Sequence, residues 1–275
     1  MWRKFLNLLI YVSILILFIN NCFAYDEEHL KTFLSEGRCN KCDLSGANFS
    51  GQYLDRVIIT DSNMTGTNFD DAKFAAVIIK SSNFSNASFN NTDMPSSSIE
   101  DSIFTNGIFN NVNLISSAIV NSNFSNTSFN EAKLYGTTFK NSIFDKSVIT
   151  KANFQKAILT GSSFINANLS GTFLSLSLIN KSNLMSADLS NSKMRGVNFS
   201  HSNLTGANLS KSSLRRAIFF KAILNNIKYK KANFYKANFT YAVLKNIDEG
   251  NTQFATAILC KTEMSNNMVD RDCSN

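Results

Sequence analysis

A hydrophobic side chain recurs at every fifth residue through most of this 275-residue chain. From Leu44 to Met264, each fifth position is apolar or aromatic, with Glu249 as the exception. An α-helix repeats near 3.6 residues and a β-strand near 2, so neither element explains a step of five. The phase never slips by one residue, which predicts one continuous repeat array without insertions.

The other positions of the five-residue unit are patterned as well. The residue two places before each large apolar residue is nearly always Ala, Ser, Thr, Gly or Val, with Gln52, Ile227 and Ile247 as larger exceptions. The remaining three positions are mostly Asn, Ser, Lys, Asp or Thr, and Asn and Ser suit the tight turns that a coil needs. One unit cannot bury its own apolar side chain, whereas stacked units can, so the pattern predicts a solenoid.

Several segments match the unit A-(D/N)-L-x-x, including CDLSGANFSG, TKANFQKA, SADLSNSKM and TGANLSKSS. On these residues the chain resembles the pentapeptide-repeat proteins, over roughly residues 40–265. The resemblance implies an all-β solenoid, a right-handed quadrilateral β-helix with one pentapeptide per side and four per coil. About 11 coils spaced by the distance between neighbouring strands would make a rod about 50 Å long. Glu249 interrupts the inward pattern, so a bulge is expected there, next to Gly250.

The first 24 residues are typical of a secretory signal peptide. Two basic residues precede an apolar run over residues 5–19, and the small residues Cys22 and Ala24 occupy the −3 and −1 positions of a cleavage site. Cleavage after Ala24 would deliver a bacterial protein to the periplasm or the cell exterior. Membrane anchoring would follow only if the signal stayed uncleaved or if Cys22 were lipidated.

A short capping helix is predicted at the start of the mature chain, because Asp26 can cap its first turn and Gly37 can end it. Its apolar stripe consists of Leu30, Phe33 and Leu34. The open end of a solenoid would pair with another chain, so this helix is expected to cover that end. The expected parts are a signal peptide at 1–24, a helical cap at 25–38, the β-helix at 39–265 and a C-terminal tail at 266–275.

The sequence contains no evident set of catalytic residues. Its two histidines, His29 and His201, cannot be tied to a Ser or Cys nucleophile. No metalloprotease, nucleophile-elbow or phosphate-binding motif occurs. We therefore expect a non-enzymatic protein without a cofactor or a metal.

Charge is distributed unequally along the chain. Residues 25–145 have 8 basic and 14 acidic side chains, net −6, whereas residues 146–275 have 17 basic and 6 acidic side chains, net +11. Sequence position becomes axial position in a rod, so one end should be negative and the other positive. With twenty residues per coil, seven basic residues fall on one face and its edge: Lys193, Arg195, Lys211, Arg215, Arg216, Lys231 and Lys236.

These seven residues, named here the basic docking face, have two interpretations. A docking surface for an anion would explain why the outward positions of this face lack Asp and Glu in the same coils. A solvated face that resists edge-to-edge aggregation would explain it too. Like charges at the coil spacing repel one another, and the cost grows at low salt.

Four cysteines remain after the signal peptide: Cys39, Cys42, Cys260 and Cys273. An even number in an exported chain suggests disulfides, and four cysteines allow three connectivities. The two close pairs would lie at opposite ends of the rod, and bridged Cα atoms must lie within about 7 Å. Cys39–Cys42 and Cys260–Cys273 are therefore expected as structural disulfides. The alternative for CNKC is a redox or metal site, which needs a thiolate-stabilising setting or two further ligands.

Two function classes follow. The first is an exported scaffold whose flat faces dock a protein or an anionic component of the cell envelope. The second comes from the resemblance, because some pentapeptide-repeat proteins imitate the shape and negative charge of duplex DNA and bind gyrase. That class would make the chain an inhibitor of a topoisomerase-type enzyme. Export and the basic mature chain argue against it, and the compartment argues against direct binding of nucleic acid.

Overall fold

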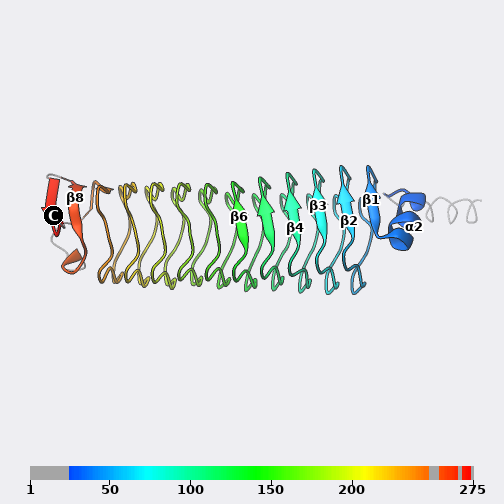
Figure 1. The fold of residues 1–275 in the computed structure, drawn as a ribbon, viewed down its shortest axis with the longest axis horizontal. Helices are drawn as coiled ribbons and strands as arrows, with labels where there is room; N and C mark the ends of the chain where they lie inside the picture. The colour runs from blue at the N-terminus through cyan, green and yellow to red at the C-terminus, as the bar shows by residue number, and fades with distance from the viewer. Residues whose placement is uncertain (1–24, 248–253, 266–267, 274–275) are drawn as a thin grey trace, which may run out of the picture.

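The chain forms a rod of stacked coils with a helix at its N-terminal end (Figure 1). The structure is a computed structural model, and it describes residues 25–247, 254–265 and 268–273. Its elements, in chain order, are α2 (Glu27–Glu36), β1 (Arg38–Asn40), β2 (Ile58–Thr60), β3 (Ile78–Lys80), β4 (Ser98–Glu100), β5 (Ala118–Val120), β6 (Thr138–Lys140), β7 (Val243–Leu244), β8 (Leu259–Met264) and β9 (Met268–Arg271).

Each coil takes twenty residues, so residues twenty positions apart pair in parallel. Strands β1 to β6 form one parallel sheet in this register, and isolated bridges such as Asp43–Asn63 continue it around the coil. The four units of a coil make four sides. We number them 1 to 4 by their inward residues in an early coil, which are Leu44, Phe49, Leu54 and Ile59. Side 4 contains β1 to β6, and the predicted solenoid of about 11 coils is confirmed.

A residue in the left-handed conformation closes each corner of the coil. The amide of Ala47 donates to the carbonyl of Leu44 at 3.0 Å, and Gly46 between them has a φ of 71°. A positive φ at the third residue is the mark of a type II turn. The equivalent position has positive φ in every unit from Lys41 to Asn246. Asn and Asp tolerate that conformation better than most residues, which accounts for part of the polar pattern.

Phenylalanine rings stack in columns inside the rod. On side 2, Phe69, Phe89, Phe109 and Phe129 lie nearly parallel, with successive ring centroids 5.0, 4.7 and 4.6 Å apart. A second column on side 1 runs from Phe84 to Phe164. Such separations favour ring–ring attraction beyond the burial of area. The inward assignment of every fifth residue is therefore confirmed along these columns.

A buried column of serines satisfies backbone amides at the corner between sides 4 and 1. The hydroxyl of Ser82 accepts from the amide of Ser62 at 3.1 Å, and the hydroxyl of Ser102 accepts from the amide of Ser82 at 3.2 Å. The same bond recurs at later coils, with interruptions. Among the described residues, no buried side-chain nitrogen or oxygen lacks a partner. The small inward position is thus a hydrogen-bonding site as well as a tight one.

Helix α2 begins and ends where the sequence predicts. The Asp26 carboxylate accepts hydrogen bonds from the amides of His29 and Glu28 at 3.0 and 2.8 Å. These bonds lower the pKa of Asp26, the one from His29 most strongly. Gly37 ends the helix with a φ of 65°, which only glycine adopts at no steric cost.

The apolar stripe of α2 is narrower than predicted. Phe33 is fully buried and packs edge-on against Phe49, with ring centroids 5.3 Å apart. Leu30 is partly buried against the core, but Leu34 is 54% exposed. The helix is one short element lying across the end of a narrow rod, so a single large side chain fills the contact.

The predicted C-terminal tail at 266–275 includes strand β9, which closes this end of the rod. Strand β9 pairs antiparallel with β8, and the Arg271 guanidinium donates to the carbonyls of Phe254 and Ala257 at 2.8 and 2.9 Å. The bulge predicted at Glu249 and Gly250 lies outside the described residues.

Candidate docking face and cysteine pairs

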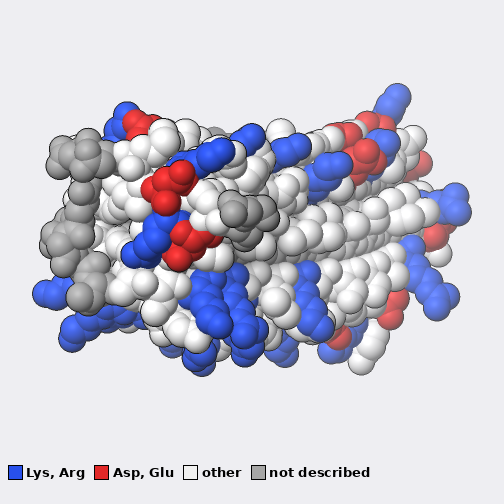
Figure 2. Space-filling view, turned by 60° about the vertical axis from the view of Figure 1, so that its left-hand side comes forward, with Lys and Arg blue, Asp and Glu red and all other residues white. Residues whose placement is uncertain are grey.

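The basic docking face occupies side 3 and its two corners. Lys193 lies on side 3, in register with Phe173 and Ser213 of the adjacent coils. All seven side chains of the face are exposed. Figure 2 shows Lys and Arg gathered along the lower edge of the rod near its C-terminal end. The other six residues lie at or next to turns of the coil. At the corner between sides 3 and 4 lie Arg216 and Lys236, with Arg195 and Arg215 next to it. At the corner between sides 2 and 3 lie Lys211 and Lys231.

Aromatic rings support three of these cations. Lys193 lies over Phe173 of the preceding coil, 5.0 Å from the ring centroid. Arg215 and Lys236 both lie over Tyr235, at 5.2 and 5.5 Å. Cation–π contacts of this kind hold a charge in place without neutralising it.

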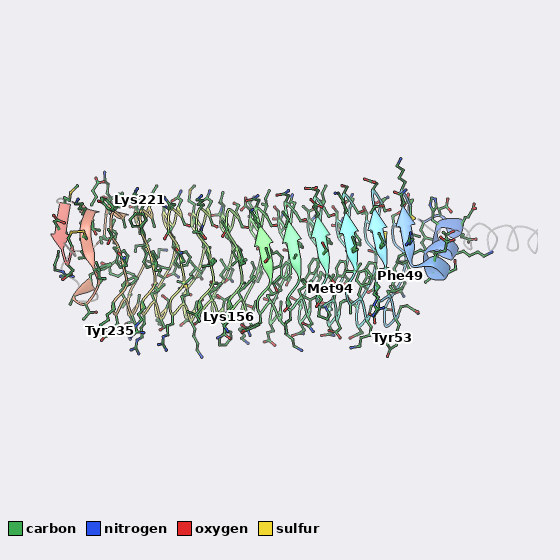
Figure 3. All side chains as sticks on the ribbon, in the orientation of Figure 1. Phe49, Tyr53, Met94, Lys156, Lys221 and Tyr235 are labelled. Carbon is green, nitrogen blue, oxygen red and sulfur yellow. A yellow bond between two sulfur atoms is a disulfide. The ribbon has the colours of Figure 1, made fainter. Side chains whose placement is uncertain are left out.

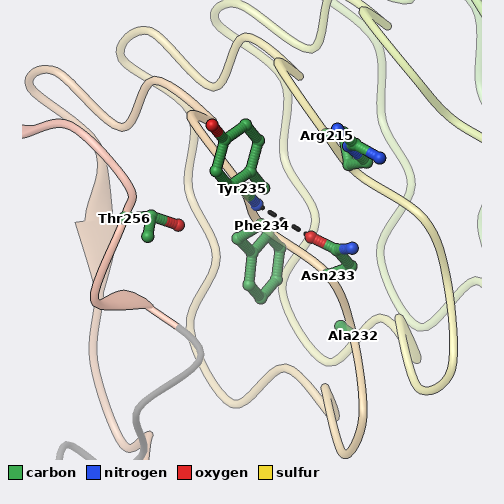
Figure 4. Close-up of a pocket in the computed structure, with 6 residues that line it drawn as sticks. All are labelled: Arg215, Ala232, Asn233, Phe234, Tyr235 and Thr256. Atoms are coloured by element: carbon green, nitrogen blue, oxygen red, sulfur yellow. Dashed lines mark hydrogen bonds between the residues drawn. The ribbon is translucent and has the colours of Figure 1, made fainter.

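Tyr235 also lines an open hollow of about 400 Å³. In Figure 4, Arg215 and Thr256 lie on opposite sides of Tyr235, and the amide of Tyr235 donates to the Asn233 side chain at 3.0 Å. The lining residues are Arg215, Ala232, Asn233, Phe234, Tyr235 and Thr256. The hollow contains one cation and no carboxylate, so it suits an anionic or neutral polar group.

The cations of the basic docking face differ from several other cations of the rod in their partners. In the C-terminal half, for example, Lys245 pairs with Glu263 at 2.7 Å. In the N-terminal half, Lys73 pairs with Asp93 at 3.2 Å and Lys80 with Glu100 at 3.3 Å, each pair joining neighbouring coils. Within the described part of the chain, six residues of the basic docking face have no ion pair with a carboxylate: Lys193, Arg195, Lys211, Arg215, Arg216 and Lys236. Their charge is therefore directed to solvent or to a partner.

The sequence pattern did not reveal the ring–cation contacts, although a spacing near twenty residues between a cation and an aromatic residue is a usable signal. Lys156 shows it with Tyr135 at 5.5 Å. Contact with Tyr135 raises the pKa of Lys156, first through a side-chain hydrogen bond and then through charge attraction. The cation is thereby stabilised in its charged form.

A protein-family model described as pentapeptide repeats matches eight copies over residues 38–71, 67–106, 108–145, 146–177 and 182–219. The chain belongs to the pentapeptide-repeat family. Comparison of its sequence with curated proteins gives no significant match.

Solved pentapeptide-repeat proteins are similar to this one over much of its length. HetL, involved in heterocyst differentiation regulation in the cyanobacterium Nostoc sp. strain PCC 7120, is 17% identical, with 89% of this chain and 99% of HetL covered and a TM-score of 0.40. QnrB1, a plasmid-mediated fluoroquinolone resistance protein, is 18% identical over 76% of this chain and 93% of its own, with a TM-score of 0.34. A protein from the Arabidopsis thaliana thylakoid lumen is 26% identical over 45% of this chain and 79% of its own, with a TM-score of 0.24.

This pentapeptide-repeat protein has one cysteine pair at each end of its rod. Cys39 is bonded to Cys42, with Cα atoms 5.5 Å apart, and Cys260 to Cys273, with Cα atoms 4.8 Å apart. Asp270 lies beside the second pair, so three potential metal ligands come within 4.8 Å of one another there. Because the two sulfurs are bonded to each other, they are not available as thiolate ligands.

We expect non-reducing peptide mapping of freshly purified protein to recover these two pairs and no other. The pairs are local, so neither requires the far end of the rod to approach. The result is checked by mass spectrometry after alkylation of free thiols. A Cys42–Cys260 peptide from monomer, or free thiols at all four positions, would contradict the expected structural pairing.

No helix in the described part of the chain is both long and apolar enough to cross a membrane. The predicted signal peptide lies outside the described residues and stays a prediction.

Proposed function

We propose that this pentapeptide-repeat protein is an exported, non-enzymatic scaffold whose basic docking face binds an anionic component of the cell envelope or an acidic protein surface. The main support is the set of six exposed cations, Lys231 left aside, that have no ion pair with a carboxylate among the described residues. They lie on a regular sheet-like surface, and three of them are held against rings. Binding to a pre-organised array loses less conformational entropy than binding to free side chains.

The DNA-mimic class is less well supported by the charges. A mimic of duplex DNA needs a continuous negative surface, and residues 25–145 have a net charge of only −6. Part of that charge is used in ion pairs between coils, such as Lys73–Asp93 and Lys80–Glu100. The basic half, net +11, would repel a DNA-binding cleft.

Cell fractionation with N-terminal sequencing tests export. The expected result is mature protein outside the cytoplasm that begins at Tyr25. Full-length chain retained in the cytosol would contradict the proposal of an exported scaffold and would favour the alternative, inhibition of a topoisomerase-type enzyme.

Retention of the mature protein on immobilised polyglutamate tests the basic docking face. Retention should fall steeply with salt, because each contact is between exposed charges. Replacing Arg195, Arg215, Arg216 and Lys236 by Ser should abolish it without lowering Tm. The matched control replaces Lys73, Lys80, Lys133 and Lys151 by Ser, which removes the same charge elsewhere and should leave most retention. Equal loss in both variants, or no retention of the parent, would contradict a localised docking face.

A further inference from the structure

Side 4 changes chemical character along the rod. Around β2 to β4, this side and its corners include the carboxylates of Asp61, Glu100 and Asp101, and Glu100 is paired with Lys80. From residue 153 to 247 and from 254 to 261, the outward positions of side 4 and its two corners contain no Asp or Glu. The carboxylate of Asp270 in β9 marks the C-terminal limit of this surface, where it accepts a hydrogen bond from the amide of Lys261 at 3.2 Å. A surface distinct from the N-terminal half therefore covers the C-terminal coils of this side.

Exposed cations line both corners of this surface. Figure 3 shows Lys156 and Tyr235 at one edge of the rod and Lys221 at the opposite edge. In the twenty-residue register, Arg216 and Lys236 share the corner of Lys156, while Lys181 and Lys261 share the corner of Lys221. All six of these cations are exposed.

Rings accompany the cations at the corner between sides 4 and 1, as they do on the basic docking face. Lys221 lies 5.2 Å from the ring centroid of Phe220 and 5.7 Å from that of Tyr241. Lys261 lies over Tyr241 at 5.5 Å. The aromatic side chains thus stand at the edges, next to the charges.

The middle of the surface is aliphatic and amide. Ile158, Leu178 and Ile218 project from the centre of side 4 and are 39%, 41% and 37% exposed. Asn198 lies between Leu178 and Ile218, and the bridges Leu178–Asn198 and Asn198–Ile218 keep them in one axial row. The row runs between the two cationic corners.

Leu176, at the corner between sides 3 and 4, adds a further exposed apolar side chain to this surface. Leu176 is 57% exposed and occupies the left-handed position with a φ of 62°. That position is filled by Asn, Asp, Ser, Lys or Gly in most other coils. A bulky apolar side chain is costly there both in conformation and in water, so the sequence departs from its own pattern next to this surface.

We propose that the C-terminal part of side 4, with its two corners, binds the surface of an anionic lipid bilayer. Lys and Arg next to a membrane attract anionic headgroups, aromatic residues favour the headgroup level, and aliphatic side chains enter the acyl boundary. This surface has the three kinds of side chain in that arrangement, cations and rings at the rims and aliphatic residues between them. A soluble polyanion would use the cations alone and leave the aliphatic row in water.

The inference rests on the proposed function only in placing the chain at the cell envelope. It concerns side 4, whereas the basic docking face is centred on side 3. The two surfaces share the corner of Arg216 and Lys236, whereas the corner of Lys181 and Lys221, between sides 4 and 1, is part of the proposed lipid-binding surface only. Variants at that second corner therefore separate the two.

Co-sedimentation of the mature protein with vesicles tests the proposal. The probe is vesicles of phosphatidylglycerol and phosphatidylcholine in equal amounts, compared with vesicles of phosphatidylcholine alone. The parent should partition to the first and not to the second. Lys181→Ser with Lys221→Ser should reduce partitioning roughly tenfold or more. The matched control, Lys193→Ser with Lys211→Ser on side 3 and its far corner, removes the same charge and should change it by less than about twofold.

A second pair of variants tests the aliphatic row, and these substitutions leave the net charge of the protein unchanged. Leu178→Ser with Ile218→Ser should also weaken partitioning, because the apolar contact is lost. The similarly exposed Ile103 and Ile108 lie on sides 1 and 2, and their change to Ser should have no effect. No binding of the parent to anionic vesicles, equal losses in both charge pairs, or full binding of the Leu178 and Ile218 variant would overturn the inference. Retention on polyglutamate without vesicle binding would overturn it while leaving the proposed function intact.

Discussion

Replacing Phe124 by Asp should unfold the centre of the rod, with a loss of more than about 4 kcal/mol in the free energy of unfolding. The Phe124 ring is fully buried and stacks on Phe104 and Phe144, with centroids 4.8 and 5.1 Å away. A carboxylate in its place would lie in a hydrocarbon column without a cation to pair with. Thermal melting followed by circular dichroism measures the effect.

The control for this prediction is Lys140→Asp on the outside of the same region. Lys140 is exposed at the end of β6, so its change should alter the free energy of unfolding by about 0.5 kcal/mol or less. Equal losses for the two variants would show that the inward assignment is wrong.

Replacing Phe33 by Ala should loosen the N-terminal cap and cost about 3 kcal/mol. Phe33 is the buried residue of α2, and its ring contacts the first ring of the side 2 column, Phe49. Without it, the helix would no longer cover the open coil, whose unpaired backbone groups could then pair with another chain. Denaturant unfolding measures the first effect, and light scattering during the titration measures the second.

Leu34→Ala is the matched control for the cap. Leu34 adjoins Phe33 in sequence but is more than half exposed, so its removal should be nearly silent. If Leu34→Ala destabilised the protein as much as Phe33→Ala, the helix would have to dock through a different face from the one described here.

The repeat could be predicted from sequence because its period is independent of tertiary context. Each unit buries its large apolar residue against the similar units stacked next to it, so the residues that make the pattern are also the residues of the core. Gln52 illustrates the limit. It occupies a small inward position by the pattern but is exposed. Ile227, another exception, is buried.

The ends of the rod were less predictable, since each occurs once and has no repeat to average over. The start of α2 next to Asp26 could be predicted from the capping side chain. Which apolar residues of the helix are buried depends instead on the angle at which the helix crosses the coil. Strand β9 has only four residues and lies outside the repeat, and its position against β8 depends on contacts such as those of Arg271 with the carbonyls of Phe254 and Ala257.

The candidate docking face was predictable in position but not in detail. The twenty-residue register placed Arg195 beside Arg215 without any structure. The ring contacts of Arg215 and Lys236 with Tyr235 depend on side-chain rotamers that the period does not determine. The surface on side 4 was missed for a related reason, because Leu178 and Ile218 occupy outward positions that the pattern assigns to polar residues.

The twenty-residue register also sets the unit by which this protein could change length. Adding or deleting one whole coil leaves every later side chain on its original side, and only shifts it along the axis by one coil spacing. A block of five residues inserted between Leu178 and Arg216 would still keep every fifth side chain inward, but it would rotate everything after it by a quarter turn. Arg216 would then leave the corner it shares with Lys156, and Ile218 would leave the row of Leu178. The five-residue inward pattern is compatible with both kinds of change, whereas a binding surface assembled from successive coils is compatible only with the first.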